Sequence, residues 1–192
     1  MGSSSSLFSF MTEEMLDEYV QLTYLSRTEI FHLLKKFLLL TPDGKIRDPE
    51  YRYPLEFIVE VFPQLKYNPF RDRIFKVFSS LKDDRFSFED MLDLCSVMSE
   101  NCPDHIKARW AFEIFDFNED GLVDKEDIDM AIERLTQGKD AERVVEDEEK
   151  NHIITVLLKA MDLQGNGSIN QLEFEHAVGK MSEFPSSFSF RI

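Results

Sequence analysis

Residues 116–127 constrain the fold of this chain more than any other stretch, because they space oxygen-bearing side chains like the ligands of an ion. Side-chain oxygens fall at loop positions 1, 3, 5, 9 and 12, which are Asp116, Asn118, Asp120, Asp124 and Asp127. Gly121 lies at position 6, where the backbone must turn sharply, and Leu122 offers its carbonyl at position 7. An acidic turn that binds nothing would not need all of these features together. The spacing predicts a loop that surrounds a hard divalent cation with oxygen.

Loops of this kind, known as EF-hands, lie between two helices, so their flanks should show helical periodicity. Apolar residues recur at i, i+3, i+4 and i+7 on both sides of the loop. They are Ala108, Ala111, Phe112 and Phe115 before it, and Ile128, Ala131, Ile132 and Leu135 after it. The same template fits around 162–173 and 79–90, and around a longer loop from Leu38 to Pro54. We therefore predict an all-α fold of four EF-hand units in two lobes.

The fourth loop, 162–173, offers fewer charged ligands than the third. Its ligand positions are held by Asp162, Gln164, Asn166, the Ser168 carbonyl, Asn170 and Glu173. Only Asp162 and Glu173 carry charge, whereas the third loop has four acidic ligands, and cation affinity rises with ligand charge. We predict a weaker fourth site, with an empty loop as the alternative.

Position 12 of the third loop decides which cation it prefers. A Glu there reaches the ion with both oxygens and completes the large coordination shell of Ca²⁺. Asp127 is one methylene shorter and tends to give one oxygen, which favours Mg²⁺ relative to a normal hand without excluding Ca²⁺. Both Ca²⁺ and Mg²⁺ are therefore expected ligands.

The first two loops lack such ligand sets. The first begins with Leu38, Leu39 and Leu40 and carries an insertion. The second has Leu81 at position 3 and Asp84 in place of the turn glycine. Neither is expected to form an oxygen cage, so we predict two degenerate hands retained for packing.

Local signals divide the chain into segments. We predict an N-terminal tail (1–11), a lobe with the two degenerate hands (12–100), a lobe with the two metal-binding hands (101–182) and an apolar C-terminal tail (183–192). Ser26 and Glu29 predict a capping box, and Pro103 suits a helix start. The acidic stretch from Gly138 to Lys150 is expected to be an exposed linker.

The two tails suggest membrane and partner contacts. Gly2 followed by Ser6 matches the N-myristoylation pattern, although a flexible serine leader would look the same. One acyl chain without a polybasic segment gives only reversible membrane contact. The segment 183–192 contains three Phe and Ile192. It either completes the core or occupies a hydrophobic groove until a partner helix arrives.

Composition excludes several classes of function. Twenty-two basic against 37 acidic residues leave a net charge of −15, which argues against a nucleic-acid partner. No apolar run is long enough for a membrane span, and Cys95 and Cys102 form no CxxC pair, so a reduced cytoplasmic protein is expected. No nucleophile–base pair or phosphate-binding loop is evident, so we predict that the chain is not an enzyme.

Several motifs together point to one family. They are Gly2, 17–19, 25–30, Asn68-Pro69-Phe70-Arg71-Asp72-Arg73-Ile74, 86–90, 111–120, and Ser187-Phe188 with Arg191-Ile192. In these motifs the chain resembles the calcium- and integrin-binding proteins (calmyrins) along nearly its whole length. The resemblance implies two non-binding hands, a third hand with Asp at position 12 and a myristoylatable glycine. Gln164 and Asn166 depart from it, because the family usually carries Asp at both positions.

The resemblance also implies a function. Members of this family bind helical cytoplasmic segments of membrane proteins, such as integrin α tails, and some are subunits of transmembrane channel-like mechanotransduction channels. We therefore expect a Ca²⁺/Mg²⁺-binding adaptor, peripheral at the inner face of the plasma membrane, that holds an amphipathic helix in a hydrophobic groove. The main alternative is a structural subunit that keeps Mg²⁺ bound and ignores calcium transients. A calcium buffer and a phosphatase regulatory subunit fit less well, because two loops lack ligands.

Overall fold

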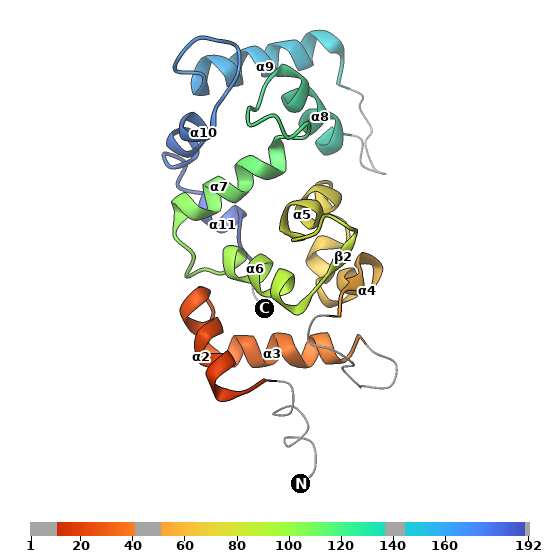
Figure 1. Cartoon of the computed structure of the whole chain (residues 1–192). Helices are drawn as coiled ribbons and strands as arrows, with labels where there is room; N and C mark the ends of the chain where they lie inside the picture. The colour runs from red at the N-terminus through yellow and green to blue at the C-terminus, as the bar shows by residue number, and fades with distance from the viewer. Residues whose placement is uncertain (1–10, 41–50, 137–144, 191–192) are drawn as a thin grey trace. The chain divides into compact units, whose positions relative to one another are not determined.

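The computed structural model describes residues 11–40, 51–136 and 145–190, which are mostly helical (Figure 1). The helices are α2 (Glu13–Leu22), α3 (Arg27–Leu38), α4 (Leu55–Val61), η1 (Pro63–Leu65), α5 (Arg71–Phe78), α6 (Phe88–Met98), α7 (Asp104–Phe115), α8 (Lys125–Thr136), α9 (Asp147–Met161), α10 (Gln171–Val178) and α11 (Phe184–Ser187). Two short strands, β1 (Tyr53–Pro54) and β2 (Arg85–Phe86), pair antiparallel. The all-α prediction is confirmed.

Helix starts follow the local signals in the sequence. Ser26 and Glu29 form the expected capping box at α3, in which the Ser26 N–H donates to Glu29 Oε2 at 2.7 Å. α7 begins directly after Pro103, as predicted. α9 begins at Asp147, so the last residues of the predicted linker are helical instead, and residues 137–144 lie outside the described part.

The chain divides into two compact units. Unit 1 comprises the chain up to Tyr67, Phe75–Cys102 and the end from Ser189, while unit 2 comprises Asn68–Ile74 and Pro103–Phe188. The lobes predicted from the sequence are contiguous and meet at residue 100. The boundary between the compact units, after Cys102, lies close to that point. Two short segments are exceptions, because Asn68–Ile74 belongs to unit 2 and the end from Ser189 belongs to unit 1.

The core of unit 1 gathers around the paired strands. Tyr53 lies opposite Phe86, and the Phe37 ring packs edge-on against the Tyr53 ring with centroids 4.8 Å apart. Phe86 holds position 8 of the second loop, so its partner Tyr53 holds position 8 of the first. The first loop therefore ends at Phe57. The end at Pro54 inferred from apolar spacing is wrong, because Leu55, the first apolar residue of α4, already lies inside the loop at position 10.

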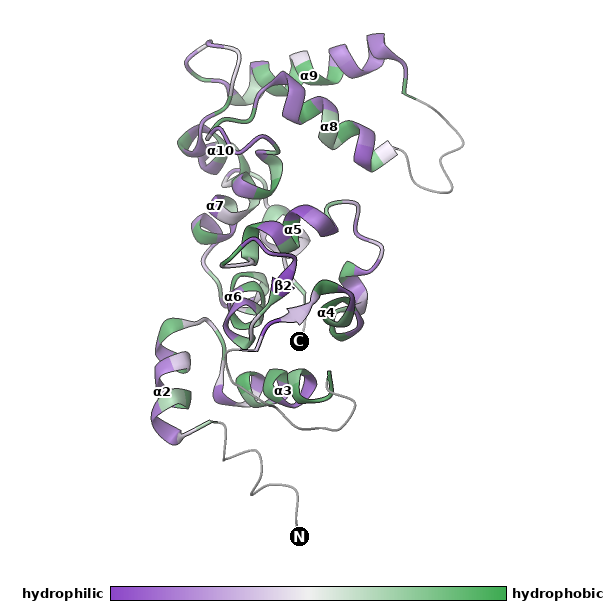
Figure 2. Ribbon diagram, turned by 45° about the vertical axis from the view of Figure 1, so that its right-hand side comes forward, coloured by the Kyte–Doolittle hydropathy of each residue, from purple (hydrophilic) through white to green (hydrophobic). Residues whose placement is uncertain are grey.

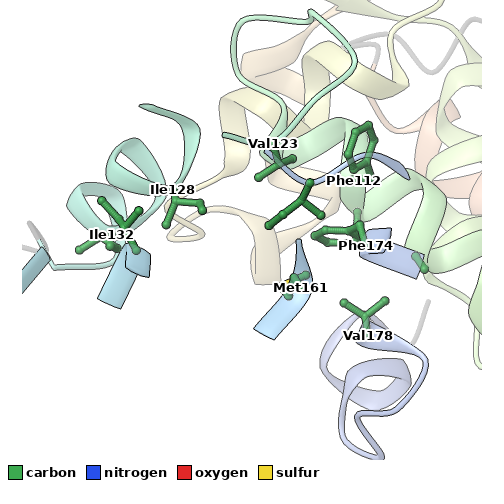
Figure 3. Packing of buried hydrophobic residues seen from close by; sticks show 11 residues of the cluster. Phe112, Val123, Ile128, Ile132, Met161, Phe174 and Val178 are labelled. Carbon is green, nitrogen blue, oxygen red and sulfur yellow. The ribbon is translucent and has the colours of Figure 1, made fainter. Parts of the chain in front are cut away.

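The core of unit 2 collects apolar residues from four helices and both loops (Figure 3). Phe112 of α7 packs edge-on against Phe174 of α10, with ring centroids 5.7 Å apart. Each such fully buried side chain contributes roughly 1.5–3 kcal/mol relative to exposure. Figure 2 shows hydrophilic and hydrophobic residues interspersed along α9, as expected for a helix with one buried face. This core holds the third and fourth loops between their helices.

Candidate metal-binding loops

Asp116 anchors the third loop at position 1, directly after α7. Its side chain is buried, and its two oxygens accept hydrogen bonds from the backbone N–H groups of Asp120 (3.2 Å) and Gly121 (2.8 Å). Gly121 has a φ of 84°, a left-handed conformation that glycine adopts without strain. No atom within 4 Å would meet a Cβ there, so the backbone angle and not crowding explains this glycine.

Asp127 closes the same loop from position 12. It is buried, and its carboxylate accepts hydrogen bonds from the N–H groups of Phe117 (2.8 Å) and Asp124 (3.1 Å). Burial is the main cause that raises the pKa of Asp127 above its ordinary value, since it disfavours the charged form. A divalent cation beside this carboxylate would offset that cost, because metal binding favours the ionised form.

The fourth loop repeats this arrangement. Asp162 accepts hydrogen bonds from the N–H groups of Gly165 (2.6 Å) and Gly167 (2.8 Å). Glu173 is buried and accepts from the N–H groups of Leu163 (2.9 Å) and Asn170 (3.0 Å). The hydrogen bond from Gly167 is the main cause that lowers the pKa of Asp162. Positions 1 and 12 are thus held in the same way in both loops.

A short antiparallel bridge joins the two loops. Val123 and Ile169, both at position 8, exchange two backbone N–H···O=C hydrogen bonds of 2.9 Å, and both side chains are buried. A change in the backbone of one loop therefore reaches the other through this pair.

The remaining predicted ligands lie on the outer part of their loops. Asn118 donates to Asp120 at 2.9 Å, and Asp120 accepts from the N–H of Leu122 at 2.9 Å. Three other side chains accept hydrogen bonds from amides two or three residues ahead: Asp124 from Glu126, Asn166 from Ser168, and Asn170 from Glu173. Gln164 donates its own N–H to Glu173.

The donor sets of both loops consist of oxygen atoms, which suits a hard cation such as Ca²⁺ or Mg²⁺. Within the described ranges, no three His, Cys, Asp or Glu side chains converge into a ready-made ion site. Amide-anchored carboxylates at positions 1 and 12, with a left-handed glycine at position 6, nevertheless fit an oxygen-ligated ion, and three of these four carboxylates, all but Asp162, are buried.

One buried residue that supports the third loop was missed as a site residue from the sequence. Arg73 donates to the carbonyls of Glu113 (2.8 Å) and Asp116 (2.6 Å) and to the Glu119 carboxylate (3.0 Å). Its guanidinium also lies 5.7 Å from the centroid of the Phe117 ring. These contacts satisfy carbonyls at the end of α7, which helical hydrogen bonds leave free. The only sequence signal was its place in the 68–74 motif.

The second loop has the same backbone conformation as the third. Its backbone has left-handed residues at positions 4 and 6, Lys82 (φ 50°) and Asp84 (φ 56°), as the third loop has at Glu119 (φ 61°) and Gly121. Asp90 at position 12 is buried and accepts from the N–H groups at positions 2 and 9, at 3.0 and 2.9 Å. The loop thus keeps the conformation of a metal loop, and that it binds no metal stays a prediction.

Comparison with known proteins agrees with this architecture. A family model described as an EF-hand domain pair matches residues 106–179, which span the third and fourth loops. Fold and loops thus define an EF-hand protein. Over the full length of both chains, the protein is 33% identical to calcium and integrin-binding family member 2 of Mus musculus and 35% identical to that of Danio rerio. The Drosophila melanogaster protein of the same name is 36% identical, over 94% of this chain and 96% of its own. The chain belongs to the calcium and integrin-binding family.

Two predictions concern the membrane: the absence of a membrane span and the lipidation of Gly2. In the part of the chain that the structure describes, no helix has both the length and the apolar character needed to cross a bilayer. Gly2, the predicted lipidation site, lies outside the described residues.

Proposed function

We propose that this protein is a calcium-binding regulatory adaptor that binds Ca²⁺ and Mg²⁺ in its third and fourth loops and holds an amphipathic helix of a membrane protein. The observation that carries the metal part is the matched anchoring of Asp116 with Asp127 and of Asp162 with Glu173. The family and the EF-hand pair support regulation rather than catalysis. The relatives are named for binding calcium and integrin, and we extend both properties to this chain.

The third loop is the principal site in this proposal. It carries four acidic ligands against two in the fourth, and its anchoring residues at positions 1 and 12 are both buried. Short Asp127 supports occupancy by Mg²⁺ at resting calcium levels, followed by exchange for Ca²⁺. The fourth loop has the longer Glu173 but few charges, so it responds only at higher calcium concentration.

The C-terminal tail supports a helix as the partner. Phe184 and Phe188 are spaced i and i+4, stack with centroids 5.8 Å apart, and pack against the core of unit 2. This is the spacing of anchor residues on an amphipathic helix. The buried Lys107 holds the segment through the carbonyls of Pro185 and Phe188, each at 3.4 Å. The tail thus occupies apolar surface in the way that an incoming helix would.

The net charge of the chain also indicates which kind of helix it would bind. A net charge of −15 favours a helix flanked by basic residues, since opposite charges speed association. A cytoplasmic segment close to the membrane fits this description. With Gly2 myristoylated, the adaptor would sit at the inner face of the plasma membrane through a weak anchor and its partner together.

The alternative function is a structural subunit that keeps Mg²⁺ bound. Asp127 favours it, because a loop selective for Mg²⁺ would be occupied at all times. Calorimetric titration of Ca²⁺ into Mg²⁺-loaded protein, with and without a basic amphipathic peptide, separates the two. Calcium that displaces Mg²⁺ and alters peptide affinity supports the adaptor. Peptide affinity equal in both metals supports the structural subunit.

A further inference from the structure

The second hand of unit 1 is closed by an arginine from the first hand. Arg52, immediately before β1, donates to the carboxylates of Asp83 (2.7 Å) and Asp90 (2.7 Å). It also donates to the Ser79 hydroxyl at 2.9 Å and the Arg85 carbonyl at 2.8 Å. The arginine side chain is only 14% exposed and that of Asp90 only 3%.

These four partners hold the ligand positions of an EF-hand loop. Ser79 is position 1, Asp83 position 5, the Arg85 carbonyl position 7 and Asp90 position 12. The same positions of the third loop are Asp116, Asp120, Leu122 and Asp127. The guanidinium therefore hydrogen-bonds the same loop oxygens that coordinate a divalent cation in a metal-binding EF-hand.

The chemistry of the two cations makes this exchange reasonable. A guanidinium is always charged and has five N–H donors in a rigid plane, so it bonds several oxygens at once. The Ser80 hydroxyl accepts a further hydrogen bond of 2.9 Å from the same group. Hydrogen bonding to Arg52 is the main cause that lowers the pKa of the Asp83 carboxyl, so that group stays ionised.

We propose that Arg52 is the resident cation of the second hand, so that this hand keeps its loaded loop conformation without any divalent metal. Unit 1 then remains in one state at every calcium concentration, and the calcium response of the protein is confined to unit 2. The left-handed backbone at Lys82 and Asp84 agrees with this, because ordinary side chains adopt it only where surrounding contacts fix it.

Hydrogen exchange measured by mass spectrometry on the full chain tests the proposal. In the unsubstituted protein, amides of 79–90 should exchange at the same rate in excess chelator and in Ca²⁺. Exchange in peptides from 116–127 reports separately on metal binding by the third loop. The result for 79–90 tests the proposal whether or not those peptides respond to Ca²⁺. Slower exchange of 79–90 in Ca²⁺ than in chelator would overturn the proposal, since it would mean that metal loads this loop.

Substitutions then test Arg52 itself. Arg52→Met should speed exchange of 79–90 at least tenfold in chelator, while Lys35→Met, which removes an exposed positive charge on α3 of the same unit, should not. Asp83→Asn is a milder variant that keeps size and removes one partner charge, with Asp84→Asn as its control. It should also speed exchange of 79–90, by a smaller factor. If Arg52→Met and Asp83→Asn exchange no faster than their controls, the arginine is not what holds the loop.

Discussion

The Arg73 guanidinium donates a 2.6 Å hydrogen bond to the backbone carbonyl of Asp116, the first ligand position of the third loop. Its second nitrogen bonds the Glu119 carboxylate at position 4 of the same loop. One buried side chain thus fixes the start of the loop without supplying a ligand. Arg73 affects metal binding by positioning the loop, and its removal leaves buried carbonyls without a hydrogen-bond donor.

Arg73→Leu should destabilise unit 2 by about 2–4 kcal/mol, because buried charged hydrogen bonds are lost while the apolar volume is kept. Ca²⁺ affinity of the third loop should fall with it. Chemical denaturation followed through Trp110 fluorescence gives the stability, and calorimetry gives the affinity. Arg71→Leu, an exposed change of equal charge two residues earlier, is the control. Equal effects of both substitutions would contradict the positioning role.

Asp127→Glu should increase selectivity for Ca²⁺ over Mg²⁺ by roughly tenfold, or about 1.4 kcal/mol. The longer side chain reaches the ion with both oxygens, as Glu173 can in the fourth loop. Competition calorimetry with the two cations measures the ratio. Glu173→Asp is the mirror substitution and should lower the ratio at the fourth site. A ratio that stays constant in both variants would show that position 12 does not set selectivity.

Asp116→Ala should lower the melting temperature of unit 2 more than Asp162→Ala in the presence of Mg²⁺. The more tightly bound ion contributes more stability, and Asp116 has the more acidic loop around it. Repeating the melts in excess chelator isolates the metal contribution, because each Ala also removes acceptors from two or more loop amides. A larger metal-dependent loss in Asp162→Ala would reverse the proposed ranking of the sites.

Local spacing was sufficient to predict the third and fourth loops, because their anchoring hydrogen bonds join residues only three to ten apart in sequence. The role of Arg52 was not predictable in this way. It reaches Asp83 and Asp90 from 31 and 38 residues away, out of the first loop. Arg73 acts over a separation of 43 residues to Asp116. Such pairings depend on tertiary packing, which periodicity does not encode.

In excess chelator, the carboxyl groups of Asp127 and Asp162 should titrate with different pKa values. Burial raises the pKa of Asp127, so the folded state holds its proton more tightly, and the stability contributed by this group falls as pH rises through the raised pKa. Amide donors lower the pKa of Asp162, so its contribution is present at neutral pH and lost as pH falls through the lowered value. Carboxyl-carbon NMR should give a higher midpoint for Asp127 than for Asp162. Coincident midpoints would contradict the difference in environment.

The apolar tail should compete with a partner helix for surface on unit 2. Phe184→Ala with Phe188→Ala removes the stacked anchors but keeps the carbonyls that Lys107 binds, so the buried lysine stays satisfied. Calorimetry of this variant against a basic amphipathic peptide should show roughly tenfold tighter binding than the unsubstituted chain, because the competitor is weakened. Leu172→Ala, an exposed apolar change on α10, should leave the affinity unchanged. Deletion of 183–192 should increase the affinity at least as much, provided that circular dichroism shows a folded protein. Equal affinities in folded variants would mean that the tail only completes the core.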